Sequence, residues 1–300
     1  MATDTVSSLI KFCPIETGIK VLSSQSLRWS APHLFNDPFE LHYGSRPDLS
    51  AASLLDVLLR EALIMLFGPD APTGRHNRLV NVMARWREQQ RFCDEEEAQD
   101  VLRELLGQIA ELQERQVEEY LRQWQNFAGN VRIACFSEKP NNIACWQRFA
   151  DRHRGIALRF ECGDDTGLPK PQRMSYQTHA PVVTSQQEQL EVIYGRRNLP
   201  VADEFPGKLL IKGRHDGLEQ EWRCFDTTAP DGDDPALWFD LRKFPAHELR
   251  AVYFGALTAQ ADKDLVAKLM RSNYPTAKIY QAAVLPGRYE VEFSSWSPPR

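Results

Sequence analysis

The sequence predicts an α+β protein in which a mixed, mostly antiparallel sheet carries an inserted helical lobe. Many short strand candidates, with few regular helices between them, occur before residue 50 and again after residue 130. The intervening residues 50–129 place apolar side chains at helical spacing over long runs. We therefore expect a core domain of residues 1–49 and 130–300, and a helical insertion or subdomain of residues 50–129.

Composition and charge narrow the classes of function. The chain has 300 residues, 42% of them hydrophobic and 26% charged, and a net charge of −5. This negative charge predicts no overall attraction to nucleic acid or to anionic membranes. Because the chain shows neither a signal-peptide pattern nor a long uncharged apolar stretch, we expect a cytoplasmic protein without a membrane partner.

The motifs of several large enzyme classes are missing from the sequence. No GxGxxG follows a strand, and no P-loop, HExxH or GxSxG motif occurs. The six cysteines are scattered and never form CxxC, which predicts reduced thiols. We therefore predict no metal.

The first part of the chain predicts a strand, a helix and a second strand. Apolar and polar residues alternate over Ile10–Phe12 and again over Leu27–Trp29. Residues 15–24 between them suit a helix with its apolar residues facing inward.

A rigid polar turn, Phe35–Glu40 (FNDPFE), follows these strands. Asn and Asp side chains bond their own backbone in tight turns, and Pro38 keeps the preceding residue out of a helix. The two Phe rings would fix the turn to a core. The turn is either ordinary architecture or one wall of a site to which Asn36 and Asp37 contribute.

The insertion predicts three helices, over residues 50–68, 74–92 and 94–129. Three glutamates open the third helix, where the helix dipole favours them. Its apolar stripe predicts either a core or a surface for a protein partner or for self-association.

The remainder of the chain returns to mixed structure. Strands are predicted at 131–136 and 156–160, with a helix over 141–151 between them. Further strands are predicted at 191–194, 221–225, 252–254, 278–283 and 289–293, together with a helix at 259–270.

Polar and aromatic residues near the first of these strands are candidate site residues. Ser137 stands at a strand end, where polar groups can project into a cleft, and Trp146 could supply a stacking surface. His153, at the turn before Gly155, is either a structural hydrogen-bonding residue or a catalyst.

The segment Glu219–Arg223 (EQEWR) carries two carboxylates and a guanidinium. The segment is predicted to begin a strand, in which Glu219, Glu221 and Arg223 share one face. That face is either a solvated ladder or a site in which Arg223 orients a catalytic Glu221 and keeps it ionised. An ionised Glu221 could stabilise a cationic transition state or bind a pair of ribose hydroxyls.

The order of these segments resembles a bacterial family catalogued as domain of unknown function 2971. The resemblance rests on Lys11–Phe12, Phe35–Glu40, the long block Cys135–Phe160, Glu219–Arg223 and the late strand 252–255. It covers both ends of the chain but not residues 50–128.

The opening strand, helix and NDP turn are also similar to the start of ADP-ribosyltransferase-like enzymes. The similarity implies that Lys11, Ser137 and Glu221 occupy the three key positions of that fold, with NAD as the nucleotide substrate. It implies an ADP-ribosyltransferase or NAD glycohydrolase, of the kind found among toxins and phage-defence effectors. Here Asn36 and Asp37 would shape one wall, and Trp146 would stack on nicotinamide or adenine.

Two other functions are compatible with the residues. A non-enzymatic binding or regulatory module would use the helical lobe for its partner and the polar turns as architecture. Nucleic-acid processing is suggested by scattered arginines, but the net charge opposes it. These arginines are Arg148, Arg152, Arg154 and Arg159.

Overall fold

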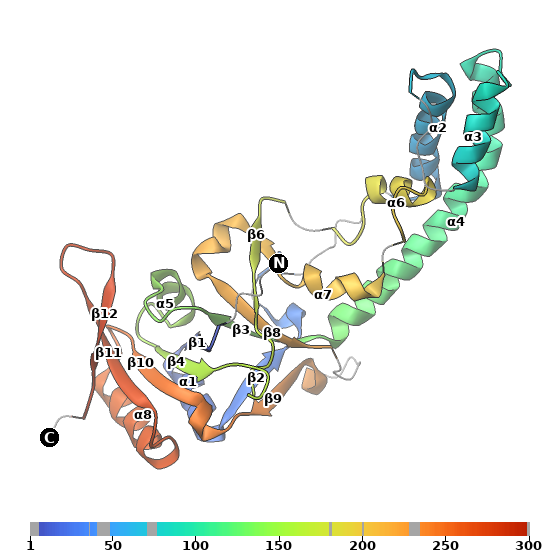
Figure 1. The fold of residues 1–300 in the computed structure, drawn as a ribbon. Coiled ribbons are helices and arrows are strands. Elements are labelled where there is room, and N and C mark those ends of the chain that lie inside the picture. Colours follow the sequence, from blue (N-terminus) through green and yellow to red (C-terminus); the bar gives the residue numbers. More distant parts are fainter. Residues whose placement is uncertain are drawn as a thin grey trace. The chain divides into compact units, whose positions relative to one another are not determined.

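The computed structural model describes residues 6–35, 37–40, 49–70, 77–179, 182–199, 201–227 and 235–298. The fold class is α+β, as predicted (Figure 1). The chain forms two compact units, which we call the sheet unit and the helical unit. The sheet unit comprises Met1–Leu41, Ala128–Ala180 and Leu210–Arg300; the helical unit comprises His42–Phe127 and Pro181–Leu209.

Within the described ranges, the sheet unit is built on one ten-stranded sheet. Its main path runs β12-β11-β10-β4-β1-β3-β2-β9, while β8 pairs with β3 and β5 with β8. Neighbouring strands are antiparallel except β10 and β11, which are parallel. The strands are β1 Ser8–Cys13, β2 Ser26–Ser30, β3 Arg132–Ser137, β4 Ile156–Glu161, β5 Gln172–Arg173, β8 Glu221–Asp226, β9 Phe239–Lys243, β10 Leu249–Phe254, β11 Lys278–Val284 and β12 Val291–Ser295. A separate parallel pair joins β6 Ser175–Gln177 to β7 Ile211–Gly213.

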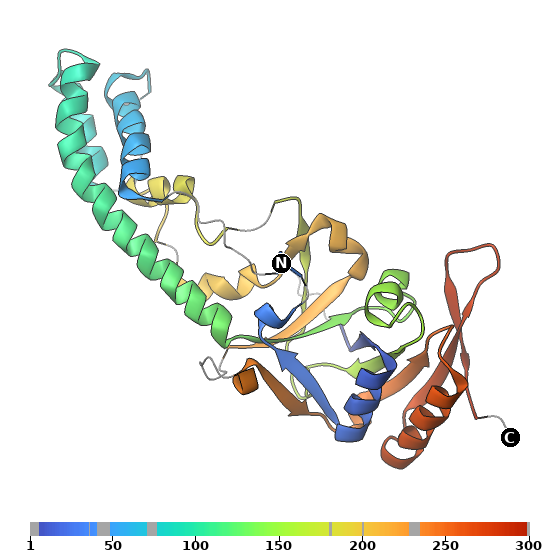
Figure 2. The same ribbon diagram turned by 180° about the vertical axis from the view of Figure 1, so that it is seen from behind.

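Strand β1 shows why the sheet has two apolar faces. Successive side chains of a strand point to opposite faces, so Leu9 enters one core and Ile10 the other. The Leu9 core includes residues of α1 (Ile15–Ser24) and α8 (Gln260–Asn273), whereas the Ile10 core includes residues of α5 (Ile143–Phe149). Figure 2 shows α1 and α8 from behind.

The helical unit contains α2 (Ala51–Phe67), α3 (Arg78–Glu88), most of α4 (Glu95–Asn130), α6 (Gln186–Ile193) and α7 (Phe205–Lys208). Ser50 caps α2 and Asn77 caps α3, since each side chain accepts a hydrogen bond from a first-turn backbone N–H. Helices α2, α3, α4 and α6 share one core, in which α4 buries Leu102, Leu106 and Ala110. The apolar stripe of α4 is therefore largely core. None of the helices described is both long and apolar enough to cross a membrane.

The structure differs from the sequence prediction around residue 190. Residues 191–194, predicted as a strand, instead end helix α6, because a reciprocal capping box between Ser185 and Glu188 starts a helix there. Leu190 and Ile193 then enter the core of the helical unit. Consequently, the described residues of 182–209 belong to the helical unit and not, as predicted, to the core domain.

Candidate functional site

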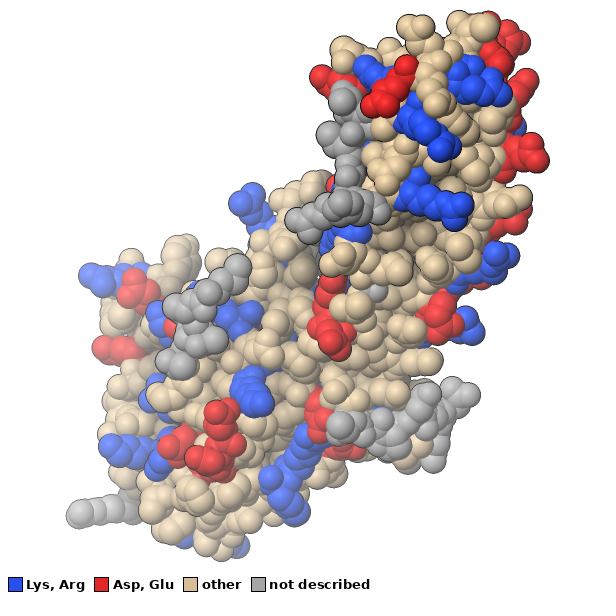
Figure 3. Space-filling view, turned by 45° about the vertical axis from the view of Figure 1, so that its right-hand side comes forward, with Lys and Arg blue, Asp and Glu red and all other residues tan. Residues whose placement is uncertain are grey.

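A pocket of about 630 Å³ opens in the sheet unit, and charged and aromatic side chains line it. Its cations are Lys11, Arg28, Arg148, Lys212 and Arg223, and its anions are Asp37, Glu40, Asp216, Glu219 and Glu221. Five phenylalanines also line it: Phe12, Phe35, Phe39, Phe136 and Phe149. The two charge signs are also interspersed over the surface in Figure 3, where neither dominates. The pocket therefore offers balanced charge and apolar rings to a ligand.

Arg223 of β8 is the centre of the pocket's buried charge. Its Nη1 and Nη2 donate to the two carboxylate oxygens of Glu40, at 2.7 and 2.8 Å, and its Nε donates to Glu221 Oε1 at 2.7 Å. Only 1% of Arg223 is exposed. Glu221 and Arg223 are two residues apart on one strand, so they share the face that meets the turn.

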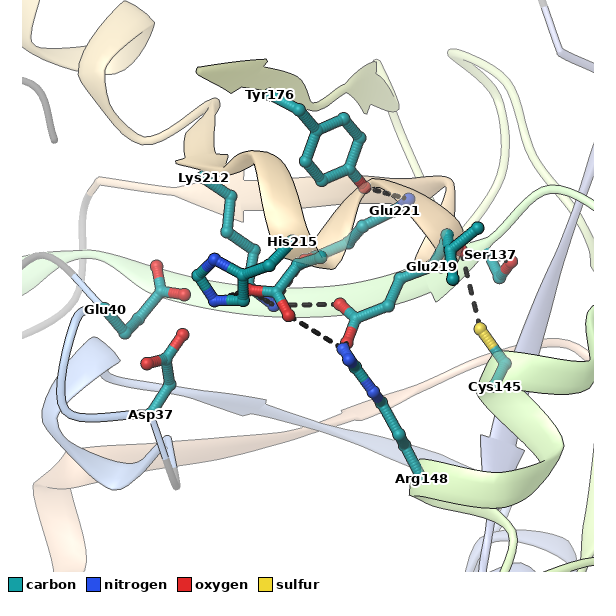
Figure 4. Close-up of polar contacts among 12 residues, drawn as sticks. Asp37, Glu40, Ser137, Cys145, Arg148, Tyr176, Lys212, His215, Glu219 and Glu221 are labelled. Carbon is teal, nitrogen blue, oxygen red and sulfur yellow. Dashed lines mark hydrogen bonds and ion pairs between the residues drawn. The ribbon is translucent and has the colours of Figure 1, made fainter. Parts of the chain in front are cut away.

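Lys212 and Arg148 extend this network across the pocket (Figure 4). Lys212 Nζ of β7 lies 3.3 Å from Glu221 Oε2 and 2.9 Å from Glu219 Oε2. Arg148 of α5 bonds to Glu219, and its Nη1 donates to Asp216 Oδ1 at 2.7 Å. Both carboxylate oxygens of Glu221 and of Glu219 are thus held by cations.

The charges fix the ionisation of Glu221. Burial by itself would raise the pKa of this carboxyl, but Arg223 and Lys212 outweigh burial and lower the pKa to about 2. Burial would likewise lower the pKa of Lys212, whereas Glu221 and Glu219 raise it well above its ordinary value. Glu221 is therefore a fixed negative charge at neutral pH.

Backbone geometry separates Glu219 from strand β8. Glu219 ends the 3₁₀ helix η3 (Arg214–Glu219), and Gln220 adopts a left-handed conformation with φ of 48° before the strand begins at Glu221. The prediction of one continuous strand was therefore wrong. The solvated-ladder interpretation was also wrong, because Glu219, Glu221 and Arg223 are all buried.

Hydrogen bonds to backbone hold this bend in place. Ser137 Oγ donates to the Glu219 carbonyl at 2.8 Å, and Asn142 Nδ2 donates to the same oxygen at 3.1 Å. Tyr176 OH accepts from the Glu221 backbone N–H at 2.8 Å. Ser137 thus lines the pocket and positions the carboxylate segment.

The turn that Asp37 and Pro38 begin forms another wall of the pocket. Asp37 Oδ1 accepts from the backbone N–H of Phe39 at 2.9 Å, which is an Asx-turn. Phe39 is 76% exposed, so the expectation that both Phe rings anchor the turn was wrong. The buried Glu40 carboxylate, paired with Arg223, fixes it instead. Asn36 lies outside the described residues.

Lys11 of β1 lines the pocket beside these groups. Its Nζ donates to the Cys135 carbonyl at 2.9 Å and lies 5.5 Å from the centre of the Phe136 ring. The Lys11 side chain therefore contacts strand β3 while it lines the pocket.

Trp146 and His153 lie elsewhere. Trp146 is fully buried, donates from its indole N–H to the Pro140 carbonyl at 2.7 Å and packs edge-on against Phe12. The His153 ring stacks on Trp146 with centroids 6.0 Å apart, and burial lowers its pKa. Neither residue lines the pocket, so Trp146 is unavailable to stack on a ligand there.

The structure thus brings together Lys11, Asp37, Ser137, Glu221 and Arg223, but not Trp146 or His153. Sequence reasoning missed Lys212, His215 and Asp216. The only feature of the sequence that marks these residues is the charged run 211–216 (IKGRHD). This run reaches the pocket because β7 pairs with β6, which the sequence does not predict. In the part of the chain that the structure describes, no His, Cys, Asp or Glu group could hold a metal ion.

Comparisons with models of protein families, with curated proteins and with solved structures found no match.

Proposed function

We propose that the sheet unit is an NAD-consuming enzyme of the ADP-ribosyltransferase type, which breaks the bond between nicotinamide and ribose. The observation that carries the proposal is the buried, permanently ionised Glu221 in the pocket wall. Breaking this bond places positive charge on the ribose in an oxocarbenium-like transition state. A fixed carboxylate in a water-poor site stabilises such a charge without having to reorganise.

The chemistry of the leaving group further favours this substrate. An ordinary O-glycoside needs a carboxylic acid to protonate its leaving oxygen. Glu221, with a pKa of about 2, cannot donate that proton at neutral pH. The nicotinamide of NAD is a pyridinium before cleavage and departs as a neutral molecule, so it needs no proton.

The remainder of the pocket suits a nucleotide. Its volume of about 630 Å³ lies within the range of about 300–1,000 Å³ typical of small-molecule sites. Phe149 is 43% exposed and can present a ring face, while Lys11 and Arg28 supply positive charge for phosphate oxygens.

The test is release of free nicotinamide from NAD, measured chromatographically, with proteins and nucleic acids present as acceptors. We expect the unmodified protein to release nicotinamide and Glu221→Gln to release at least 100-fold less. Glu161→Gln is the matched control, because Glu161 pairs with Arg250 at the surface and does not line the pocket. Equal release from the unmodified protein and Glu221→Gln would refute the proposal.

One observation favours a second function, a nucleotide-binding module without catalysis. Both oxygens of Glu221 are already bound, to Arg223 and to Lys212, as in a purely architectural ion pair. Such a module would show a rise in melting temperature with NAD but no nicotinamide release. Measuring both quantities on the same sample separates the two functions.

A further inference from the structure

His215 is the one histidine among the described pocket-lining residues. It lies in the 3₁₀ helix η3 with 66% of its side chain exposed, so both solvent and a ligand can reach the ring. His215 has no role in the proposed function so far.

Two contacts fix the imidazole in spite of its exposure. Its Nε2 lies 3.3 Å from Asp216 Oδ2, and Arg148 holds the other oxygen of Asp216. The ring also lies directly on Gly213: a Cβ at that position would be 2.4 Å from His215 Cε1 and 2.8 Å from Nδ1. The His215 ring can therefore occupy this space only because residue 213 has no side chain.

The chemistry of the proposed reaction leaves a role open for this group. The nucleophile that attacks the ribose must lose a proton, and Glu221 is badly suited to accept it. Its two oxygens are engaged by Arg223 and Lys212, and a strongly acidic carboxyl is a weak base. A histidine oriented by an aspartate is the commonest solution to this requirement.

We propose that His215 is the catalytic base of the reaction, taking the proton of the attacking nucleophile while Asp216 orients the imidazole. This inference rests on the function proposed above. With water as nucleophile, a C–O bond forms at the ribose C1′ as the C–N bond breaks. The bonding electron pair goes to the nicotinamide nitrogen, and the water proton goes to His215 and then to solvent.

Other charged groups from several elements lie near His215 in the pocket wall. Asp216 and Glu219 belong to its own helix, Lys212 comes from β7 and Arg148 from α5. Asp37 and Glu40 contribute from the turn on the pocket wall. Most of these groups are paired with one another.

The test measures nicotinamide release from NAD as a function of pH. We expect the rate of nicotinamide release by the unmodified protein to rise from pH 5 to pH 8, as a histidine loses its proton. His215→Ala should release nicotinamide about 100-fold more slowly and without that rise. Added imidazole should restore His215→Ala, because the site is open to solvent. His247→Ala is the control: His247 is exposed, lies in another 3₁₀ helix (Ala246–Glu248) and does not line the pocket.

A second variant moves the imidazole without removing it. Gly213 has φ of −64°, which alanine adopts freely, so Gly213→Ala should fold normally and displace the His215 ring. We expect Gly213→Ala to release nicotinamide at least 10-fold more slowly than the unmodified protein, with an unchanged melting temperature.

The outcomes separate the two proposals. If the unmodified protein releases nicotinamide and His215→Ala keeps its rate and pH profile, His215 is not the base. A slow His215→Ala that imidazole does not restore likewise overturns the inference, since it indicates a structural role. Absence of release from the unmodified protein refutes the proposed function, and this inference with it.

Discussion

Arg223 and Glu40 form a buried, two-pronged ion pair between residues 183 positions apart in the sequence. The exposed fractions of the two residues are 1% and 8%. Through this pair, strand β8 fixes the turn that forms one wall of the pocket. The same guanidinium orients Glu221 through its Nε, so one side chain organises two walls of the site.

Replacing Arg223 by lysine should destabilise the protein in spite of the retained charge. Lysine cannot reproduce the planar two-pronged contact, so the buried Glu40 carboxylate would lose its partner. Breaking a buried pair in this way costs about 3–5 kcal/mol in unfolding free energy. Denaturant unfolding followed by tryptophan fluorescence measures the change. Arg250→Lys is the control, since its exposed pair with Glu161 contributes less than about 1 kcal/mol.

The ionisation of Glu221 should make stability depend on pH. Its pKa falls from 4.5 to about 2 on folding, so its contribution is complete above pH 4.5 and is lost as the pH falls toward 2. That contribution is on the order of 3 kcal/mol. The difference in unfolding free energy between the unmodified protein and Glu221→Gln should therefore be largest at pH 7, fall by roughly half at pH 3 and vanish only below pH 2. A difference that is the same at both pH values would contradict the shifted pKa.

Glycine 155 should tolerate no side chain. A Cβ at this position would lie 2.2 Å from the Cys13 carbonyl oxygen, and backbone, unlike a flexible side chain, cannot move aside cheaply. We expect Gly155→Ala to lower the unfolding free energy by about 3 kcal/mol. Gly107→Ala is the opposite case, because Gly107 lies inside α4 with open space around it. This variant should raise the helix's stability by about 1 kcal/mol. Melting temperatures that move in the same direction would contradict this contrast.

Local patterns in the sequence predicted most of the strands and helices. Alternation predicted β1 and β2, and helical spacing predicted α2 and α4, because these patterns mark which side of an element is buried. Residues 191–194 show where this fails. Their apolar residues fit a strand as well as a helix, and the outcome depends on the Ser185 cap and on a core formed by distant helices.

The candidate site was only partly predictable for the same physical reason. Asp37 and Glu221 stood out because turn and strand chemistry is local. Lys212 and His215 did not, because their position depends on the bend at Gln220 and on the pairing of β7 with β6. Trp146 looked like a stacking surface, but nothing local in the sequence indicates that Phe12 and His153 would enclose it.

Phe149 should contribute to ligand binding more than to folding. It lines the pocket from α5 with 43% of its surface exposed, so truncation costs less folding free energy than it would at a fully buried phenylalanine. We expect Phe149→Ala to weaken NAD binding about fivefold, through the loss of about 1 kcal/mol of ring contact, while the melting temperature without ligand falls by only a few degrees. Calorimetric titration with NAD measures this change. Leu257→Ala is the control, because Leu257 is 60% exposed in the same unit but outside the pocket, so its truncation should leave the affinity unchanged. Equal affinities of Phe149→Ala and the unmodified protein for NAD would show that the Phe149 ring does not contribute to binding.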